Sequence, residues 1–509
     1  MHLKRFVKNN IRIEAAVICI IILAVHSFTL MRFPPPHGDE AWMASRAWEF
    51  VHSGIAFGPL DRGVLDRFEG SRFFYSWLFT AIQSLGVRLF GLPSLLAIRF
   101  ISLVAGFVLL FAVYAIGLAL DGKKLGLFGV AFTAFSWPFF FSAHLGRPDI
   151  IAAALGFSAI ALHLNNRSAR ILFSALAGLL AALAFEVHVH AAVYGPTLIA
   201  LYLVKYRWSL LRKRVFWGLI AGALAGLAFY LVLHVLPAPR TFLRLNQLVF
   251  TATHIPPILA LDLSVILDAF QQMAILVLWV FPQVIIGIWG IIRLLRKRTP
   301  YSGVLLVLNS VLLIGFTLLI RNKFSQYAIL FTPALCLLLA AFFYDFLQLR
   351  TKTIMEQRFR QFIVIGICVF PLFLILRFNS LPAYHRVQDL VNQAVKPTDT
   401  IIGNELYWFG LKEHRYYSWH NLVFYRRYLP GSSLEDAFQS MRPDIFILDN
   451  FLDNFILDKE GEETYRQEFS LPKLELESFL SQHAELETII DTNNNKTVRI
   501  YRINWETQE

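Results

Sequence analysis

The chain has 509 residues, of which 56% are hydrophobic and 16% charged, and its formal net charge is +12. Soluble domains carry about a quarter charged residues, so this composition, with its recurring apolar runs, excludes a large soluble protein and predicts a polytopic membrane protein. The basic residues lie in short loops between apolar runs, which is typical of a positive-inside bias rather than of a nucleic-acid-binding protein. The three cysteines, Cys19, Cys336 and Cys368, all fall in apolar runs, which excludes a disulfide framework and a cysteine metal site.

Helical spans are the first elements that the sequence predicts. Because roughly 20 apolar residues cross a bilayer as a helix, each apolar run of about that length is a candidate span. Eleven such runs lie near residues 13–32, 95–120, 125–143, 149–165, 171–188, 190–206, 215–236, 272–292, 303–320, 327–347 and 361–378. No small-residue cleavage site follows the first run, so we expect it to be an uncleaved span.

The stretch 73–91 is ambiguous, because it is apolar but contains Gln83, Ser84 and Arg88. The basic clusters decide the matter, since Lys and Arg concentrate on the cytoplasmic side of a membrane. These clusters are Lys4, Arg5, Lys8 and Arg12; Lys123 and Lys124; Arg167 and Arg170; Lys205, Arg207, Arg212, Lys213 and Arg214; Arg293, Arg296, Lys297 and Arg298; and Arg350, Lys352, Arg358 and Arg360. They all fall inside only if 73–91 is an interfacial amphipathic helix. This arrangement predicts a cytoplasmic N-terminus and a C-terminal tail outside.

Three long segments are then expected on the outer side. They are the loop 33–94, the loop 237–271 and a polar tail from about residue 379 to 509. In the tail, TDTIIGNELYWF and RPDIFILDNF are typical of strands, SSLEDAFQSM of a helix, and ETIIDTNNNKTVRIYRI of a hairpin that turns at its asparagines. The predicted fold is mainly α: a transmembrane catalytic domain, 1–378, with about eleven spans and interfacial helices, followed by a small extracytoplasmic α/β domain, 379–509.

The stretch HGDEAWMASRAWEF follows the first span and opens with two carboxylates, Asp39 and Glu40. One interpretation is simply a helix start, because acidic residues in a first turn interact favourably with the helix dipole. The other is a functional site at the membrane surface, where Trp42 and Trp48 suit the interface. A helix N-terminus stabilises an ionised carboxylate, which can act as a general base.

Further ionisable groups are expected at the same face of the membrane. Glu69 either balances a nearby arginine on its loop or faces the same outer pocket as the first carboxylate pair. The short outer loop HLGRPDI keeps His144, Arg147 and Asp149 at the membrane surface, where ionisable groups are functional candidates. Capping of the following helix is the alternative for Asp149.

Two later segments add histidines and cations. FEVHVHAAVY places Glu186, His188 and His190 near the outer end of an apolar run. On a continuous helix the two histidines face differently, whereas a helix break would let both face a cavity; a buried structural role is the alternative. RNKFSQYAILFTP places Arg321 and Lys323 in a short outer loop, where cations are unusual and invite an anionic ligand such as a lipid phosphate.

The donor of any transfer reaction is predicted to be carried by a lipid. The chain has no P-loop and no G-x-G-x-x-G motif, which argues against a cytoplasmic nucleotide. Carboxylates, cations and aromatic residues instead gather at the outer leaflet. Spans can hold a lipid tail there while the loops handle its polar head.

Five segments, in their order and spacing, resemble the membrane glycosyltransferases of the GT-C fold. The closest likeness is to the branch of protein O-mannosyltransferases and lipid A aminoarabinose transferases. The segments are GDEAWMASRAWEFVHSG, RFEGSRFFYSWLFTAIQSLGVRLFG, SLLAIRFISLVAGFVLLFAVYAIGLAL, FSAHLGRPDIIAAAL and NKFSQYAILFTPAL. The likeness covers about residues 13–347, and the tail is similar to the variable periplasmic domain of bacterial members.

The resemblance implies roles for the acidic residues. Asp39 matches the first-loop acidic residue that activates the acceptor or holds a metal nearby, and Glu40 matches its neighbour. Glu69 matches a metal ligand of some members, and Asp149 matches the acidic residue of the second outer loop. A divalent metal ion held by Asp39, Glu69 and a histidine or Asp149 is therefore a candidate cofactor of unassigned identity.

The resemblance also implies phosphate contacts. Lys323 and Tyr327 fall in the late motif whose basic and aromatic groups face the lipid phosphate. Many members have Lys-Pro after the first-loop glutamate, whereas this chain has Gly70 and Ser71, so Arg72 is the candidate cation there. At the histidine stretch relatives often have Lys-Gly, which is a second departure.

The predicted function is an integral-membrane glycosyltransferase, either a hexosyl- or a pentosyltransferase. It would move a sugar from a polyprenyl-phosphate donor, such as an undecaprenyl phosphate, to a lipid, glycan or protein acceptor in cell-envelope glycosylation. Asp39 would deprotonate the acceptor in an inverting displacement, and Lys323, Arg321 or Arg72 would meet the charge of the departing phosphate. We expect the plasma membrane of a bacterium, no nucleic-acid partner, and a tail that shapes acceptor access.

Two other classes of protein compete with this prediction. A transporter or flippase of a polyprenyl-linked sugar also has intramembrane ionisable residues and broken helices. However, the two halves of the chain show no repeat, and the charged groups gather at the outer face rather than at the midplane. A sensor whose tail binds saccharide is the second competitor, and eleven spans are excessive for an anchor.

Overall fold

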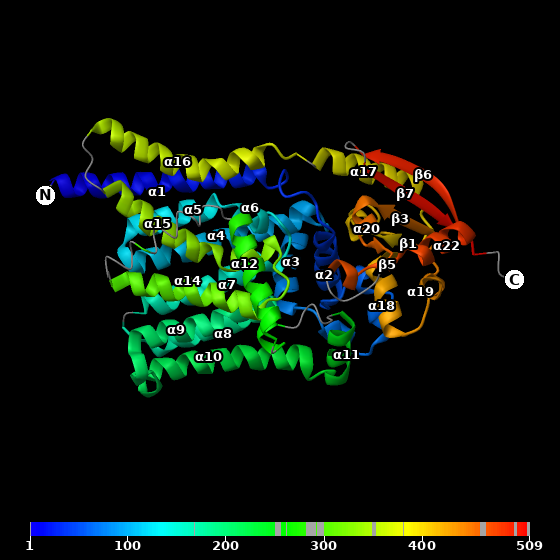
Figure 1. Ribbon diagram of the computed structural model, residues 1–509, viewed down its shortest axis with the longest axis horizontal. Helices are drawn as coiled ribbons and strands as arrows, with labels where there is room; N and C mark the ends of the chain where they lie inside the picture. Colours follow the sequence, from blue (N-terminus) through cyan, green and yellow to red (C-terminus); the bar gives the residue numbers. More distant parts are fainter. Residues whose placement is uncertain are drawn as a thin grey trace. The chain divides into compact units, whose positions relative to one another are not determined.

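Helices make up most of the residues that the structure describes, and among those residues strands occur only in the C-terminal tail (Figure 1). The computed structural model describes residues 2–166, 168–249, 256–260, 262–280, 292, 300–348, 353–379, 381–458, 465–492 and 496–505. The helices before the tail are α1 (His2–Thr29), α2 (Gly38–Ser53), α3 (Trp77–Phe90), α4 (Leu95–Asp121), α5 (Lys123–Ala134), α6 (Trp137–Ala143), α7 (Pro148–Asn165), α8 (Ile171–Val187), α9 (Tyr194–Tyr206), α10 (Arg214–Tyr230), α11 (Pro239–Val249), α12 (Leu263–Val280), α14 (Pro300–Leu319), α15 (Thr332–Gln348) and α16 (Ile354–Leu376).

Several of these helices are long and apolar enough to cross a membrane. Within the described residues, four qualify singly: Leu95–Asp121, Pro148–Asn165, Arg214–Val235 and Tyr301–Leu319. The pair α5 and α6 qualifies together as a broken span, bent by 67°. Shorter apolar helices coincide with three other predicted spans, namely Ala16–Thr29, Ile171–Val187 and Thr332–Leu347. A further one, Leu263–Leu278, overlaps the start of the span predicted at 272–292 but begins inside the predicted loop 237–271. The multi-pass character is confirmed, and the predicted total of about eleven spans stays a prediction.

The chain forms two units, each built from separated segments. The first, which we call the helical unit, contains residues 1–34, 102–229 and 256–379. The second, which we call the tail unit, contains residues 35–101, 230–255 and 380–509. The tail thus groups with most of the first predicted outer loop, so the compact units differ from the predicted division at 378/379. The predicted catalytic role of 1–378 stays a prediction.

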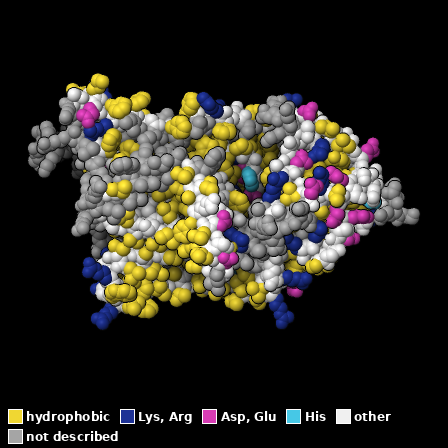
Figure 2. Space-filling view, viewed as in Figure 1, with side chains coloured by type: hydrophobic (Ala, Val, Ile, Leu, Met, Phe, Trp, Pro, Cys, Tyr) yellow, Lys and Arg dark blue, Asp and Glu magenta, His cyan; other side chains and the backbone are white. Residues whose placement is uncertain are grey.

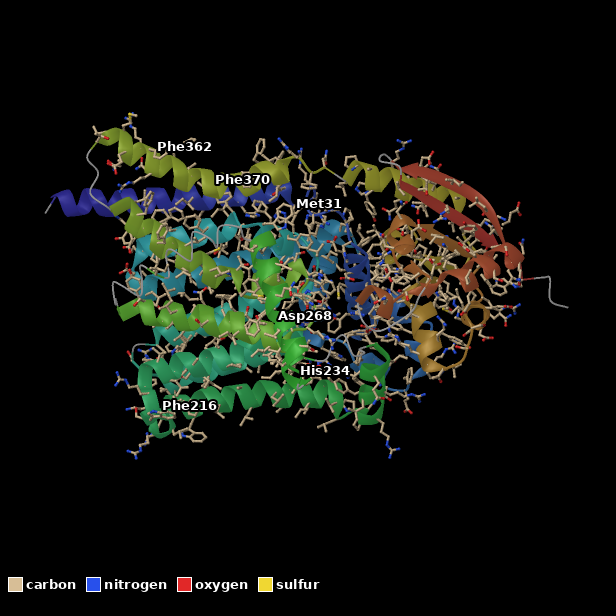
Figure 3. The ribbon with its side chains drawn as sticks, viewed as in Figure 1. Met31, Phe216, His234, Asp268, Phe362 and Phe370 are labelled. Atoms are coloured by element: carbon tan, nitrogen blue, oxygen red, sulfur yellow. The ribbon has the colours of Figure 1, made fainter. Side chains whose placement is uncertain are left out.

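Local sequence explains the packing of the helical unit, in which α1, α8, α9, α10, α14 and α16 run roughly parallel and α12 crosses them (Figure 1). Ser136 separates α5 from α6, because its hydroxyl accepts the amide hydrogen of Phe139 and Pro138 follows in the first turn. Helices α8 and α10 touch through small residues: a Cβ on Gly222 would lie 1.8 Å from the carbonyl oxygen of Ala175. Exposed aromatic side chains such as Phe362 and Phe370 lie along α16 (Figure 3), as expected of a lipid-facing helix.

The tail forms an α/β fold around a five-stranded sheet of order β2-β1-β3-β7-β6. Its strands are β1 (Ile401–Gly403), β2 (Tyr416–Ser418), β3 (Ile445–Asp449), β6 (Ala484–Thr492) and β7 (Lys496–Ile503), with a separate pair β4 (Ile456–Leu457) and β5 (Leu471–Pro472). Its helices are α17 (Leu381–Ala394), α18 (His420–Tyr428), α19 (Leu434–Met441), α20 (Asn450–Asp453), α21 (Tyr465–Glu468) and α22 (Lys473–His483). Strands β1, β2 and β3 are parallel, whereas β7 pairs antiparallel with β3 and β6.

Two apolar cores join the tail to the first outer loop within the tail unit. One packs Val64, Leu65 and Phe68 against Trp419 and other tail residues, and the other packs the first turns of α2 against β1 and β3. Figure 2 shows charged side chains gathered over the tail, while hydrophobic side chains predominate among the coloured side chains over the helices of the helical unit. This contrast is expected when one part of a chain meets water and another meets lipid.

The predicted elements of the tail are confirmed in part. The helix α19 and the strands of the hairpin β6–β7 fall where the sequence predicted them, and β1 and β3 lie inside the two predicted strand segments. The end of the first segment is instead a 3-10 helix, Glu405–Phe409, and the second segment runs into α20. Among the elements that were not predicted are β2, α18 and α22. The ambiguous stretch contains α3, a 14-residue helix that rises only about 21 Å and is therefore short for a bilayer core of about 30 Å. Its length favours the interfacial interpretation.

Part of the predicted topology falls outside the described residues. The second half of the span predicted at 272–292 does so except for residue 292, as do the asparagines of the hairpin turn and part of the loop 237–271. Several residues of the basic clusters on which the predicted orientation depends also lie outside the described residues: Arg167, Arg293, Arg296, Lys297, Arg298, Arg350 and Lys352. The cytoplasmic N-terminus and the outward tail therefore stay predictions.

Candidate functional site

Asp39 lies in the first turn of α2, in the tail unit. His37 is the N-cap, and its Nδ1 accepts the amide hydrogen of Asp39 at 3.2 Å. Glu40 completes the capping box, because its Oε2 accepts the amide hydrogen of His37 at 3.1 Å. The Asp39 side chain is 30% exposed and its carboxylate lies 3.6 Å from the His37 ring. It is therefore the member of the predicted pair that a substrate can reach.

Glu40 is held quite differently, because its side chain is completely buried. Arg99, on α4, donates from Nε to Oε1 at 2.8 Å and from Nη2 to Oε2 at 2.7 Å. Both side chains have an exposed fraction of 0%. The bidentate pair fastens the first turn of α2 to α4 within the tail unit. The predicted catalytic role of Glu40 stays a prediction.

A second buried ion pair, not predicted from the sequence, shapes the same loop. Arg46 donates from Nε to Asp61 Oδ2 at 2.8 Å and from Nη2 to Oδ1 at 2.7 Å. Asp61 also accepts hydrogen bonds from the Trp42 indole and from the Gly58 amide. The two partners are 15 residues apart, with the end of α2 and a loop between them. No local sequence pattern therefore predicts the contact.

The other first-loop candidates, Glu69 and Arg72, are exposed. Arg72 lies over the Phe73 ring, with its Cζ 4.9 Å from the ring centroid. Among the described residues no three His, Cys, Asp or Glu side chains lie close enough to hold a metal ion. The predicted ligand set of Asp39, Glu69 and a third residue is not assembled there, and metal dependence stays a prediction.

In the helical unit, three segments far apart in the sequence bring five predicted residues together. Arg147 and Asp149 precede and open α7, the histidines lie between α8 and α9, and Tyr327 lies in a short 3-10 helix, Ser325–Leu330. Ring centroids are 4.6 Å apart for His188 and His190, and 4.4 Å apart for His190 and Tyr327. The Arg147 guanidinium lies 5.8 Å from the Tyr327 centroid. We call these five residues the histidine cluster.

A helix break, one of the two alternatives considered from the sequence, brings the two histidine rings together. Helix α8 ends at Val187, and His188 takes an extended conformation before a 3-10 helix begins at Val189. The amide hydrogen of His190 is then donated to His188 Nδ1 at 3.2 Å. Both rings consequently face Tyr327 rather than opposite sides of one helix.

Asp149 is the charged centre of the histidine cluster. Its side chain is 1% exposed, and its Oδ2 accepts a hydrogen bond of 3.0 Å from Arg147 Nε. Its Oδ1 lies 3.6 Å from His188 Nε2 and has no hydrogen-bond partner within the described part of the chain. A carboxylate oxygen buried in this way can accept a substrate hydroxyl or orient the imidazole beside it.

His144, a further predicted candidate, takes part in packing within the helical unit. Its Nδ1 lies 2.9 Å from the carbonyl oxygen of Phe33, and its Nε2 lies 2.9 Å from the Nδ1 of His26. The residue is fully buried, against the Phe140 ring. This geometry matches a structural histidine that joins the end of α6 to α1 and to Phe33, just beyond α1.

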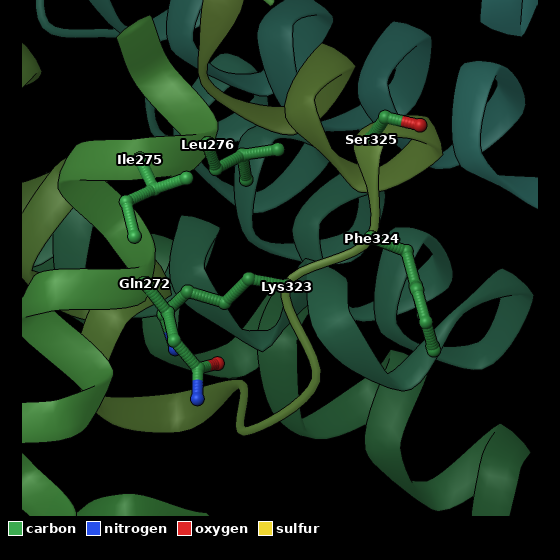
Figure 4. Close-up of a pocket in the computed structure, with 6 residues that line it drawn as sticks. All are labelled: Gln272, Ile275, Leu276, Lys323, Phe324 and Ser325. Carbon is green, nitrogen blue, oxygen red and sulfur yellow. The ribbon is translucent and has the colours of Figure 1, made fainter. Parts of the chain in front are cut away.

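Lys323 lines a pocket of about 340 Å³ in the helical unit (Figure 4). The other lining residues are Gln272, Ile275 and Leu276 of α12, and Phe324 and Ser325. The Nζ of Lys323 donates to the carbonyl oxygens of Ile320, Thr317 and Arg321 at 2.5, 3.3 and 3.4 Å. The lysine thus caps the carboxyl end of α14 and presents a cation to the pocket.

Partial burial lowers the pKa of Lys323 to about 8, although the carboxylate of Asp268 on α12 (Figure 3) opposes the shift. The apolar wall of the pocket continues along α12, where Leu267, Ile275 and Leu278 are exposed. Arg321, the neighbouring predicted cation, is partly buried. The pocket therefore combines a titratable cation with an adjoining apolar surface, which suits an amphiphilic anion.

The comparisons with known proteins agree on the fold. Residues 76–232 match the family model described as dolichyl-phosphate-mannose-protein mannosyltransferase. A search of curated proteins found no match to the sequence. The family match covers fewer than half of the residues, so structural similarity carries the larger part of the comparison.

Three solved structures illustrate the similarity. ArnT from Cupriavidus metallidurans in the apo state is 15% identical, with a TM-score of 0.61 over 95% of this chain and 97% of that chain. The same protein bound to undecaprenyl phosphate is 13% identical, with a TM-score of 0.59 over the same shares. The archaeal oligosaccharyltransferase AglB from Archaeoglobus fulgidus, in complex with an inhibitory peptide and a dolichol-phosphate, is 12% identical, with a TM-score of 0.56 over 86% and 70%. The predicted GT-C fold is thereby confirmed.

Proposed function

We propose that this protein is a membrane glycosyltransferase that moves a sugar from a polyprenyl-phosphate donor to an acceptor on the extracytoplasmic side. The observation that carries the proposal is the pocket of Lys323, where a cation meets an exposed apolar helix inside a GT-C fold. A polyprenyl phosphate has the complementary chemistry, an anionic head on an apolar chain. One structure of similar fold holds undecaprenyl phosphate, which supports the choice of donor.

The proposed reaction is a single displacement. The acceptor oxygen forms a bond with the anomeric carbon while the bond from that carbon to the phosphate oxygen breaks, and the electron pair leaves with the phosphate. Asp39 takes the acceptor proton as general base, and inversion at the anomeric carbon follows. Lys323, assisted by Arg321, meets the charge that develops on the departing phosphate. The divalent metal ion that the resemblance implies stays a prediction, and no step is assigned to it here.

The histidine cluster is proposed to orient the donor. Imidazole and phenol rings offer flat faces and hydrogen-bonding atoms to a sugar, and Asp149 fixes the Arg147 guanidinium beside them. Because Asp149 is buried and paired, its part is positioning rather than proton abstraction. Whether the sugar is a hexose or a pentose, and whether the acceptor is a lipid, glycan or protein, follows from the donor and acceptor panels described below. A bacterial plasma membrane, with the tail outside, is the setting we propose.

Replacing Asp149 by asparagine is expected to weaken donor binding about tenfold, because hydrogen bonds to charged groups contribute about 1.5–3 kcal/mol each. The effect should appear in KM for the donor more than in kcat. Donor titrations of the variant in nanodiscs measure it. The matched control is Asp262→Asn, an exposed carboxylate of the same unit. Equal KM values for wild type and D149N would show that the histidine cluster does not contribute to donor binding.

Turnover of the donor is expected to depend on pH through Lys323. The pKa of about 8 means that Lys323 carries its positive charge below pH 8 and loses it as the pH rises through 8. Since kcat/KM reports the free enzyme, kcat/KM for the donor should fall above about pH 8. Arginine keeps its charge, so Lys323→Arg should hold kcat/KM level to about pH 10. An identical alkaline fall in K323R would assign the titration to another group.

The competing function is a flippase for a polyprenyl-linked sugar. A substitution at Asp39 distinguishes the flippase from the transferase. A transferase needs this base, whereas a flippase in which Asp39 does no chemistry keeps its activity without it. The test is transport of a labelled polyprenyl-phosphate sugar across vesicles containing either wild type or Asp39→Asn. Transport that survives in D39N, with no transfer by wild type, would favour the flippase.

A further inference from the structure

Polar side chains collect at one edge of the tail sheet, where its three parallel strands end. Asn404 and Glu405 follow β1, Ser418 ends β2 with His420 close behind, and Asp449 ends β3. In open α/β sheets this edge, outside the carboxyl ends of parallel strands, is where ligands usually bind. The polar edge of the tail is therefore the candidate functional surface of this domain.

The groups of this edge are held rigidly. Glu405 is 2% exposed, its Oε1 lies 2.8 Å from His420 Nδ1, and it accepts the Ser418 hydroxyl hydrogen. Burial raises the pKa of Glu405, but the contacts with His420 and Ser418 outweigh it and lower the pKa below its ordinary value. Ser418 and Glu405 both meet the same ring nitrogen, so they do not form a nucleophilic triad with His420. On the other side, Asn404 Nδ2 donates to Asp449 Oδ2 at 2.9 Å.

The first turn of α2 fills this edge. A Cβ on Gly38 would lie 3.0 Å from Glu405 Oε2 and 3.1 Å from Asn404 Oδ1, so only glycine lets the two segments approach without displacement. The Trp42 and His420 rings are 5.2 Å apart. The ionised carboxylate of Glu405 also interacts favourably with the positive amino end of the dipole of α2, a 16-residue helix.

We infer that the polar edge of the tail is a socket for the start of α2, and that Asn404 and Glu405 are positioning residues for Asp39. Gly38, which touches the socket, immediately precedes Asp39 in the chain. The tail thus becomes part of the catalytic apparatus, beyond any effect on acceptor access. The inference rests on the proposed function, because positioning matters only if Asp39 acts in the reaction.

A disulfide tests the socket without reference to activity. A Cβ on Gly38 would lie 3.8 Å from the Cβ of Glu405, which is the usual separation in a disulfide. The double variant Gly38→Cys/Glu405→Cys should therefore link on mild oxidation of the intact protein in nanodiscs, with the joined peptides identified by mass spectrometry. The control pair is Gly38→Cys with a cysteine at the exposed Glu477 of α22, which should stay unlinked. Absence of the G38C–E405C link would overturn the inference.

Kinetics test the positioning. Gly38→Ala and Glu405→Gln should each lower kcat about 10- to 100-fold, since a small misplacement of a catalytic group has effects of this size. Donor affinity should stay within about twofold, because these residues hold the base and not the donor. Alanine is the better helix former, so a loss in G38A does not come from a weaker α2. The exposed variant Glu477→Gln should match wild type.

The outcomes separate the inference from the proposed function. A link together with lower kcat and unchanged donor affinity supports both. A link with wild-type kcat in G38A and E405Q overturns the positioning of Asp39. If wild type turns over no donor, the proposed function fails and the positioning falls with it, while the cross-link still decides whether the socket exists.

Discussion

Replacing Asp39 by asparagine is expected to lower kcat for sugar transfer about 10²- to 10⁴-fold, which is the usual contribution of a general base. Asparagine is nearly isosteric but cannot take the acceptor proton. Because the side chain is partly exposed, the variant should fold normally and bind the donor as wild type does. Release of polyprenyl phosphate and donor affinity, measured on the same nanodisc preparation, separate the two properties.

The matched control is Glu49→Gln, which alters another carboxylate of α2, one that pairs with Arg62 at 3.5 Å. Glu49 is partly exposed, as Asp39 is, and its long ion pair contributes little, so E49Q should retain wild-type turnover. Turnover by D39N within about threefold of wild type would reject Asp39 as the base. In that case Asp149 would be the next carboxylate to test, despite its burial.

Breaking the Glu40–Arg99 pair is expected to cause the largest loss of stability. Each partner is completely buried, so Glu40→Gln or Arg99→Met leaves a buried charge without its counterion. Such losses amount to about 3–5 kcal/mol. Thermal unfolding in nanodiscs should show a large decrease in Tm for both variants, together with reduced kcat because the first turn of α2 loses its anchor.

The double variant Glu40→Leu/Arg99→Met provides the control. Replacing a buried ion pair by apolar residues of similar volume is often neutral, so the double variant should recover most of the Tm that each single variant loses. Recovery of Tm without recovery of kcat would show that the pair orients Asp39 as well as stabilising the fold. A double variant that loses the sum of both single effects would contradict the account of a coupled pair.

Much of the fold could be predicted because apolar periodicity and turn-forming residues are local features of the sequence. The long apolar runs mark α4, α7, α10 and α14, and alternating residues around NNN mark the hairpin β6–β7. The strand β2, Tyr416–Ser418, was missed because it follows the polar run 412–415 and therefore lies in no apolar or alternating stretch. Grouping of the tail with the first loop was missed for a different reason: it depends on tertiary packing, which leaves no local signal.

The candidate site was predicted in its parts but not in its pairings. The short loop around Asp149 and the histidine stretch were expected near the membrane surface, and the break at His188 brings them together. The partner of Glu40 was not foreseeable, since Arg99 is 59 residues away inside an apolar helix. Glu405 was likewise passed over because one glutamate in a strand-like segment gives no motif. A buried charge does, however, require a partner. An arginine within an apolar helix, such as Arg99, therefore indicates that an acidic residue packs against it.

The most direct test of the central claim is donor turnover by the purified protein in nanodiscs. A panel of polyprenyl-phosphate sugars would be offered with a cell-envelope extract as the source of acceptor, and release of free polyprenyl phosphate followed for wild type and Asp39→Asn. We expect wild type to release polyprenyl phosphate from at least one donor and D39N to release almost none, with label appearing in the extract. Folded wild-type protein that binds polyprenyl phosphate yet releases none from any donor would contradict it.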